Sequence, residues 1–368
     1  MRLRGCVAIE LAVGGLLAAA GAGGAVWGVR TVRAAFPQEA SAAIAELPAP
    51  VVARAAVEPP SSWDVRPDVR PVVRPWVGLF QGKSDDLLVE PLRTASITEV
   101  KLNRGGTSLS LRLDFDNGAR AACKPEQVHL HSQPRREIAA YRINRLLGLS
   151  TVPPAIGRRF LVSDIVDHLP PDSATHRTRV MTEMIPHDDG TVLAELSWWI
   201  PVLEPARIDG FEIDSVDGVV TWKRYLTVGQ PIPADELRTV SQVSDMLLFD
   251  FLINNIDRWS GGNVKASGDR RVLYFMDNTM AFGDDPDGHS KVRTYLHRCQ
   301  KFSRRMVRRL RHLREAEVRE VLTHEIAPFD HLLEEEEIAA LLSRRDHALE
   351  YIDGLIEEHG REAVLVFP

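Results

Sequence analysis

The stretch 254–278 carries the polar residues whose types and spacing are best suited to chemistry. Asp257 and Arg258 stand together, Asn263 follows, and Asp277 comes after two short expected strands. Phosphoryl transfer needs an acceptor for the proton of the attacking hydroxyl and oxygen ligands for a cation that bridges the phosphates. Carboxylate and amide oxygens suit Mg²⁺ or Mn²⁺. We therefore predict that Asp257 is the catalytic base and that Asn263 and Asp277 bind the metal.

An earlier stretch supplies the matching cation. Lysine is scarce, with seven in the chain, and Lys124 stands at the end of an expected strand. The backbone at Gly105 and Gly106 can approach phosphates closely, because glycine has no Cβ. We predict that Lys124 binds phosphate oxygens of ATP. Glu137, early in the next helix, is predicted to pair with Lys124 and aim it.

Hydrophobic periodicity places the phosphate-binding candidates on an antiparallel sheet followed by a helix. Alternation indicates strands over 96–103, 107–115 and 119–124, with a hairpin turn at 116–118. Pro134 and Gly148 bound a helix over 135–147. These elements order Lys124 before Glu137, as the predicted pairing requires.

A further strand over 178–184 is expected to end in a hinge. The backbone of Glu183, Met184 and Ile185 would then meet the edge of the adenine ring. Beyond it, an apolar helix over 239–255 leads to the Asp257 loop, strands over 264–266 and 272–276 lead to Asp277, and the tail from 289 is helical. Trp198 and Trp199 are expected either to pack in the core or to stack on a sugar.

The N-terminal part has a different composition. Arg2 and Arg4 precede a run of low polarity that is long enough to cross a bilayer, which favours export of the remainder. An uncleaved anchor and a cleaved signal peptide both fit this pattern. The spacer that follows is rich in Ala and Pro. The expected segments are a basic leader (1–5), the apolar segment (6–29), the linker (30–75), a small lobe (76–186) and a large lobe (187–368).

Charge and cysteine content exclude some classes of protein. The net charge is −6 and the isoelectric point about 6.1, which argues against a nucleic-acid binder. The three cysteines have no CxxC spacing, so a structural zinc site is not expected. Cys123 and Cys299 could pair in an oxidising compartment or remain separate thiols.

Several motifs together resemble the secretory-pathway kinases of the Four-jointed and Golgi casein kinase group, and more distantly HipA-type and phosphoinositide kinases. They are Arg-Glu-Ile-Ala-Ala-Tyr at 136–141, Val-Pro-Pro at 152–154, Asp-Phe-Leu at 250–252, Asp-Arg at 257–258 and Phe-Met-Asp-Asn at 275–278. The resemblance implies an α+β bilobal protein-kinase-like fold, with an antiparallel-sheet small lobe and a mainly helical large lobe after an N-terminal hydrophobic helix. It also implies ATP with Mg²⁺ or Mn²⁺, and transfer to a hydroxyl of a protein or glycan outside the cytoplasm.

Four other interpretations stay open. The same scaffold could serve a lipid or small-molecule kinase, or a nucleotidyl transferase. A nucleotide-binding pseudokinase is favoured by the six positions from Asp257 to Asn263, where kinase loops have five. In a purely structural interpretation, Asp257 pairs with Arg258 and 277–278 is a plain turn. The acceptor and the oligomeric state are not predicted.

Overall fold

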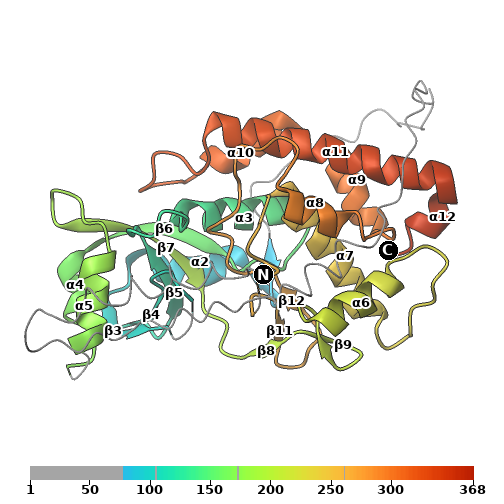
Figure 1. Cartoon of the computed structure of the whole chain (residues 1–368). Helices are drawn as coiled ribbons and strands as arrows, with labels where there is room; N and C mark the ends of the chain where they lie inside the picture. Colours follow the sequence, from blue (N-terminus) through green and yellow to red (C-terminus); the bar gives the residue numbers. More distant parts are fainter. Residues whose placement is uncertain (1–77, 104–105, 172–173, 261) are drawn as a thin grey trace, which may run out of the picture. The chain divides into compact units, whose positions relative to one another are not determined.

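The computed structural model describes residues 78–103, 106–171, 174–260 and 262–368. The predicted leader, apolar segment and linker, and Gly105 of the glycine turn, lie outside these residues. Within the described ranges, no helix combines the length and apolar character needed to cross a membrane. The described chain has two parts, a sheet region (78–198) and a helical region (199–368) (Figure 1).

The sheet region is built on five antiparallel strands in the order β3-β4-β5-β7-β6. Their bounds are β3 (Ile97–Leu102), β4 (Leu111–Phe115), β5 (Arg120–Pro125), β6 (Ala155–Leu161) and β7 (Thr191–Trp198). The turn predicted at 116–118 is confirmed, because Gly118 adopts a φ of 81° and its amide donates to Phe115. The short strands β1 (Leu79–Phe80) and β2 (Lys83–Ser84) precede this sheet.

One face of the sheet carries helix α3 (Pro134–Leu146), which packs against β6 and β7. Pro134 at its first position is pre-set for helical φ and needs no amide partner there. Residues 137–144 are all buried, so the helix is enclosed on most sides. Helix α2 (Asp85–Thr94) meets β6 and β7 as well. The predicted helix over 135–147 is therefore confirmed.

The opposite face is covered by α4 (Val162–Val166) and α5 (Ala174–Glu183), through apolar residues such as Ile165 and Val180. The strand predicted over 178–184 is wrong, because most of it lies in α5. An i,i+4 ion pair at 2.8 Å joins Arg179 to Glu183, and the Thr182 hydroxyl donates to the Thr178 carbonyl. The ion pair contributes only a few tenths of a kcal/mol, so packing of Val180 into the sheet core is the larger reason that this segment is a helix.

The strand that neighbours β5 is instead β7, which runs to Trp198. The predicted boundary after residue 186 stays a prediction; β7, which follows that position, still belongs to this sheet. Trp199 packs near Arg112, whose guanidinium carbon lies 5.8 Å from the ring centre. Cys123 belongs to the sheet core and Cys299 to the helical core, and both are free thiols.

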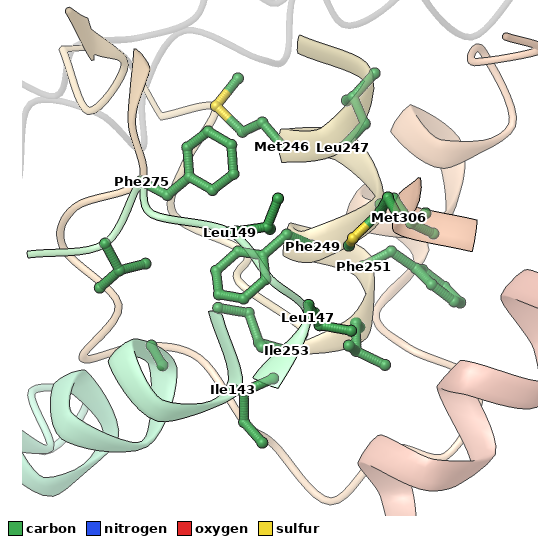
Figure 2. Packing of buried hydrophobic residues seen from close by; sticks show 14 of the residues in the cluster. Ile143, Leu147, Leu149, Met246, Leu247, Phe249, Phe251, Ile253, Phe275 and Met306 are labelled. Carbon is green, nitrogen blue, oxygen red and sulfur yellow. The ribbon is translucent and has the colours of Figure 1, made fainter. Parts of the chain in front are cut away.

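The helical region surrounds α7 (Leu237–Leu252), which is nearly all apolar along its second half. Figure 2 shows Ile253, just after α7, close to Ile143 and Leu147 of the α3 segment, whereas Met246 lies farther up α7 near Phe275. All of these residues belong to one buried cluster, so both regions share this core. The other helices are α6 (Val216–Tyr225), α8 (Ser290–Leu296), α9 (Arg304–His312), α10 (Glu315–Thr323), α11 (Glu335–His359) and α12 (Arg361–Val364).

Short strands lie beside the start of the helical region. A three-stranded sheet has the order β12-β11-β8, and β9 pairs with β10. Their bounds are β8 (Leu203–Pro205), β9 (Arg207–Ile208), β10 (Phe211–Glu212), β11 (Lys265–Ser267) and β12 (Leu273–Tyr274). The predicted strand pair before Asp277 is thus confirmed, and β12 ends close to this residue.

Candidate active site

Lys124, Glu137 and Asp277 converge, although they come from β5, α3 and the loop after β12. The Lys124 ammonium lies 2.5 Å from a carboxylate oxygen of Asp277 and 3.9 Å from one of Glu137. Burial favours the neutral amine, but the two carboxylates outweigh it and raise the pKa of Lys124. The same ammonium holds the pKa of Asp277 below its usual range. An ionised Lys–Asp pair results, with a second carboxylate beside it.

Asn278 fixes Glu137 in this arrangement. The carboxylate of Glu137 accepts from the Asn278 backbone amide at 2.6 Å and from its side-chain amide at 2.9 Å. Both side chains are buried. Asp277 has a φ of 59°, which is unusual for a residue with a Cβ, so contacts from outside the loop must hold it there. The bonds from Asn278 to Glu137 are such contacts.

Asp257 lies on a loop that is closed by Asn263. The Asn263 side-chain amide donates to the Asp257 carboxylate at 2.9 Å and to its backbone carbonyl at 3.0 Å. Asn263 therefore reaches Asp257 despite the extra residue between them. Arg258 is fully buried and pairs with Asp250 at 3.2 Å. The salt bridge between Asp257 and Arg258 in the structural interpretation is not the one that forms.

Asn255 ties the Asp257 loop to the Asp277 loop. Its side-chain amide donates to the Asp277 carbonyl at 3.3 Å, and its side-chain oxygen accepts from the Asp257 backbone amide at 3.1 Å. Arg258 adds a second link, since its guanidinium donates to Asn278 at 2.7 Å and to the Met276 carbonyl. The loops that carry both predicted acidic residues are thus joined through buried polar side chains.

The oxygen donors here suit a cation that is shared with phosphates. Among the described residues, no three His, Cys, Asp or Glu side chains form a group able to hold a metal by themselves. The Asp277 side chain is 42% exposed, and only one of its oxygens meets Lys124. Asn263 donates through nitrogen to Asp257, so its side-chain oxygen is the atom that could meet a cation. One or two protein oxygens plus phosphates is how Mg²⁺ is commonly bound at such sites.

The nucleotide contacts predicted at the hinge do not have the expected surroundings. Met184 is buried after α5, and its neighbours are engaged. The Glu183 carbonyl accepts from Val128 at 2.8 Å, and the Ile185 amide donates to Glu126 at 2.9 Å. These two backbone groups are paired within the sheet region, so an adenine edge would have to displace them. The chain passes into the helical region after β7 instead.

Gly106 has open surroundings in this structure. It adopts a φ of 81°, and a Cβ built there would meet no atom within 4 Å. The conformation favours glycine for backbone reasons alone. Its contact with phosphate stays a prediction.

Glu195 belongs to the same cluster and was not predicted from the sequence. It is the cross-strand partner of Lys124, is 1% exposed, and accepts a hydrogen bond from Ser197. Burial, and then the nearby Glu137, raise the pKa of this carboxyl well above its usual value. The hydrogen bonds by which Asn255 and Asn278 hold the two loops were not predicted either. The sequence shows that these residues lie close to Asp257 and Asp277, but it does not show which groups their amides bond.

Comparisons with known proteins indicate the same group of kinases as the sequence motifs. The family profile described as "Golgi casein kinase, C-terminal, Fam20" matches residues 222–364. The extracellular serine/threonine protein kinase FAM20C of Homo sapiens is 24% identical over 330 residues, covering 76% of this chain and 56% of that protein. The chain thus spans little more than half the length of that relative.

Other relatives differ in activity. The glycosaminoglycan xylosylkinase of Danio rerio is 23% identical, over 61% of this chain and 64% of that protein. The pseudokinase FAM20A of Homo sapiens is 29% identical, over 38% and 27% respectively. The crystal structure of the Golgi casein kinase with Mn/ADP bound has a TM-score of 0.59 at 18% identity, over 77% and 78% of the two chains. The predicted resemblance, and the predicted α+β class with an antiparallel sheet and a helical region, agree with these findings.

Proposed function

This chain belongs to the Fam20 family of Golgi casein kinase-like proteins, and from that premise we propose that it transfers the γ-phosphoryl group of ATP to a hydroxyl acceptor. The acceptor would be a protein Ser or Thr, or a glycan, outside the cytoplasm, with the N-terminal segment as anchor or signal. The observation that carries this proposal is the convergence of Lys124, Glu137 and Asp277 beside the Asp257 loop.

Each residue would have a distinct task in a bilobal kinase-like fold. Lys124 would exchange its contact with Asp277 for phosphate oxygens, while Glu137 keeps the ammonium aimed. Asp277 and Asn263 would hold Mg²⁺ or Mn²⁺. The cation supplies neutralisation of the charge that develops on the phosphate oxygens. A bound cation would also offset the repulsion between the Glu137 and Asp277 carboxylates, which share one ammonium.

Asp257 would handle the proton of the reaction. The acceptor oxygen forms a bond to the γ-phosphorus, the bond from that phosphorus to the β,γ-bridging oxygen breaks, and ADP leaves. Asp257 takes the proton of the acceptor hydroxyl. Its hydrogen bond from Asn263 fixes the orientation of the carboxylate and leaves the second oxygen to face the acceptor.

A pseudokinase is the second candidate, supported by the longer Asp257–Asn263 spacing and by the FAM20A relatives. The hydrogen bonds between those two residues argue for the active form, because the added residue does not separate them. Hydrolysis or transfer that requires Asp257 would distinguish the two. Lipid kinase and nucleotidyl transferase activities would be separated by the acceptor and by the mass added to it.

The deciding experiment incubates the purified chain with labelled ATP, Mg²⁺ or Mn²⁺, and protein, glycan and lipid acceptors. We expect metal-dependent labelling of one acceptor class, with a product heavier by one phosphate. Asp257→Asn and Asp277→Asn should abolish labelling, whereas Asp188→Asn, at an exposed position, should not. Nucleotide binding without transfer to any acceptor would favour the pseudokinase. Absence of both binding and transfer would contradict the proposal.

A further inference from the structure

We propose that helix α11 holds both sides of the site in place through Glu337 and Arg344. The catalytic roles of the positioned residues rest on the proposed function, but the claim that α11 fixes the positions of α3 and the two loops does not. In protein kinases, placement of the helix that carries the Glu and ordering of the loop after the metal-binding Asp are the steps that phosphorylation controls. In this chain, α11 contacts both α3, the helix that carries Glu137, and the segment that follows Asp277.

Glu337 holds the start of the Glu137 helix. One of its carboxylate oxygens lies 2.6 Å from the Arg136 guanidinium, and the other lies 3.3 Å from that of Arg135. The Glu337 side chain is 6% exposed, and it also accepts from the Glu334 amide at 2.8 Å as part of a capping box. Charge-assisted bonds at a site this dry are strong and directional. They join the first turn of α3, which includes Glu137, to the first turn of α11.

Arg344 holds the other side through backbone carbonyls. Its guanidinium donates to Leu252 at 2.9 Å, Gly283 at 3.1 Å and Asp285 at 2.6 Å. Leu252 ends α7 just before the Asp257 loop, and the other two follow Asp277. Arg344 is fully buried, and burial lowers its pKa to about 10, which leaves it charged at neutral pH. The Arg344 side chain thus binds the backbone just before the Asp257 loop and the backbone just after Asp277.

Both contacts use one face of a single helix. Glu337 and Arg344 are seven positions apart, close to two turns at about 3.6 residues per turn. Because α11 is one continuous helix from Glu335 to His359, Glu337 and Arg344 keep a fixed position relative to each other. A shift of α3 relative to the Asp277 loop would therefore have to break one of the two contacts.

The segment after Asp277 is short and already packed. The Phe282 amide donates to Ile253 at 2.5 Å, and the His289 amide donates to the Asn254 side chain at 2.9 Å. A Cβ on Gly288 would lie 3.0 Å from the Phe251 ring and 3.2 Å from Arg344. This leaves α8 to begin at Ser290 with no long loop between it and Asp277. Order here comes from packing and from the contacts of Arg344.

Glu337→Gln tests the first contact, in the full chain with Asp353→Asn as matched control. Asp353 lies on the same helix and pairs with Arg311, away from α3. We expect amide hydrogen exchange over 138–144 of α3 to accelerate at least about tenfold in Glu337→Gln, with the interior of α11 unchanged. The Kd for ADP with Mn²⁺ should rise by a similar factor. Unchanged α3 exchange, or equal acceleration in Asp353→Asn, would overturn the proposal.

Arg344→Lys tests the second contact. Lysine keeps the charge but cannot reach three carbonyls in a fixed fork, so kcat should fall while the ADP affinity changes little. A fall in thermal stability alone, with both constants unchanged, would show a purely structural role and contradict the claim. If this variant does not fold, Arg344→Gln replaces it, because a neutral amide can still donate to one or two of these carbonyls. The same fall in kcat with little change in ADP affinity is then expected.

If the wild type neither binds nucleotide nor transfers phosphate, the proposed function fails. The exchange experiment still decides on α11 in that case, because it needs no activity.

Discussion

The two sides of the site are built in different ways. On the sheet side, Lys124 and Glu195 are cross-strand partners and Glu137 lies on a helix, so regular hydrogen-bond ladders place them. On the helical side, Asp257, Asn263 and Asp277 all lie in loops, which are held by buried amides and guanidinium groups. In a strand or helix, many backbone hydrogen bonds hold each residue, so the loss of one side-chain contact changes its position little. In a loop, a few side-chain hydrogen bonds fix the backbone, so the loss of one of them matters more. Substitutions should therefore cost more on the helical side.

The largest effect is expected from Asp257→Asn. The amide cannot accept the proton of the acceptor hydroxyl, so kcat should fall by roughly 10²–10⁴-fold. The fold should persist, because the side chain is only half buried and its bond from Asn263 goes to an oxygen that an amide also offers. Steady-state kinetics beside Asp188→Asn measure the change. A kcat near that of the wild type would remove Asp257 from catalysis.

Asn278→Ala should have the next largest effect, on stability. It removes one donor, the side-chain amide, from the buried Glu137 carboxylate and one acceptor from Arg258. The backbone donor of residue 278 remains, so we expect a loss of about 3 kcal/mol in the free energy of unfolding. Urea denaturation measures it. A loss below about 1 kcal/mol would mean that the loop does not depend on this amide.

Glu195→Gln, on the sheet side, should change how the stability of the chain depends on pH. Because folding raises the pKa of Glu195, the stabilisation that it provides is fully present below its unfolded pKa and is lost as pH rises toward its folded pKa. Glutamine has no such loss, so the variant should gain stability relative to the wild type between pH 5 and 8. Thermal unfolding across this range checks it, with Glu336→Gln, at an exposed position, as control. A pH-independent difference would show that Glu195 is ionised in the folded chain.

Gly118→Ala is expected to have the smallest effect of the four. A Cβ there meets no atom within 4 Å, so only its φ of 81° opposes the change. The cost should be about 1 kcal/mol, measured by urea denaturation. A loss of several kcal/mol would show that the sheet side also depends on single contacts, which would weaken the contrast between the two regions.

The predicted elements succeeded where the signal was local and repeated. The alternation around Leu111 and Leu113 and the helical pattern from Pro134 identified the strands and the helix correctly. The segment 178–184 failed because its β-branched residues favour a strand, while tertiary packing of Val180 and an i,i+4 ion pair favour the helix. The hinge placed at 183–185 depended on that strand and lost its basis with it.

The sequence by itself determined which residue types could do the chemistry, since Lys124, Glu137, Asp257, Asn263 and Asp277 are all recognisable by spacing and motif. Tertiary structure alone decided that Asn255, Asn278 and Glu195 complete their surroundings and that α11 spans both sides. Periodicity reports on neighbours a few residues apart. Hydrogen bonds between residues 141 positions apart, as from Asn278 to Glu137, depend on how the whole chain packs.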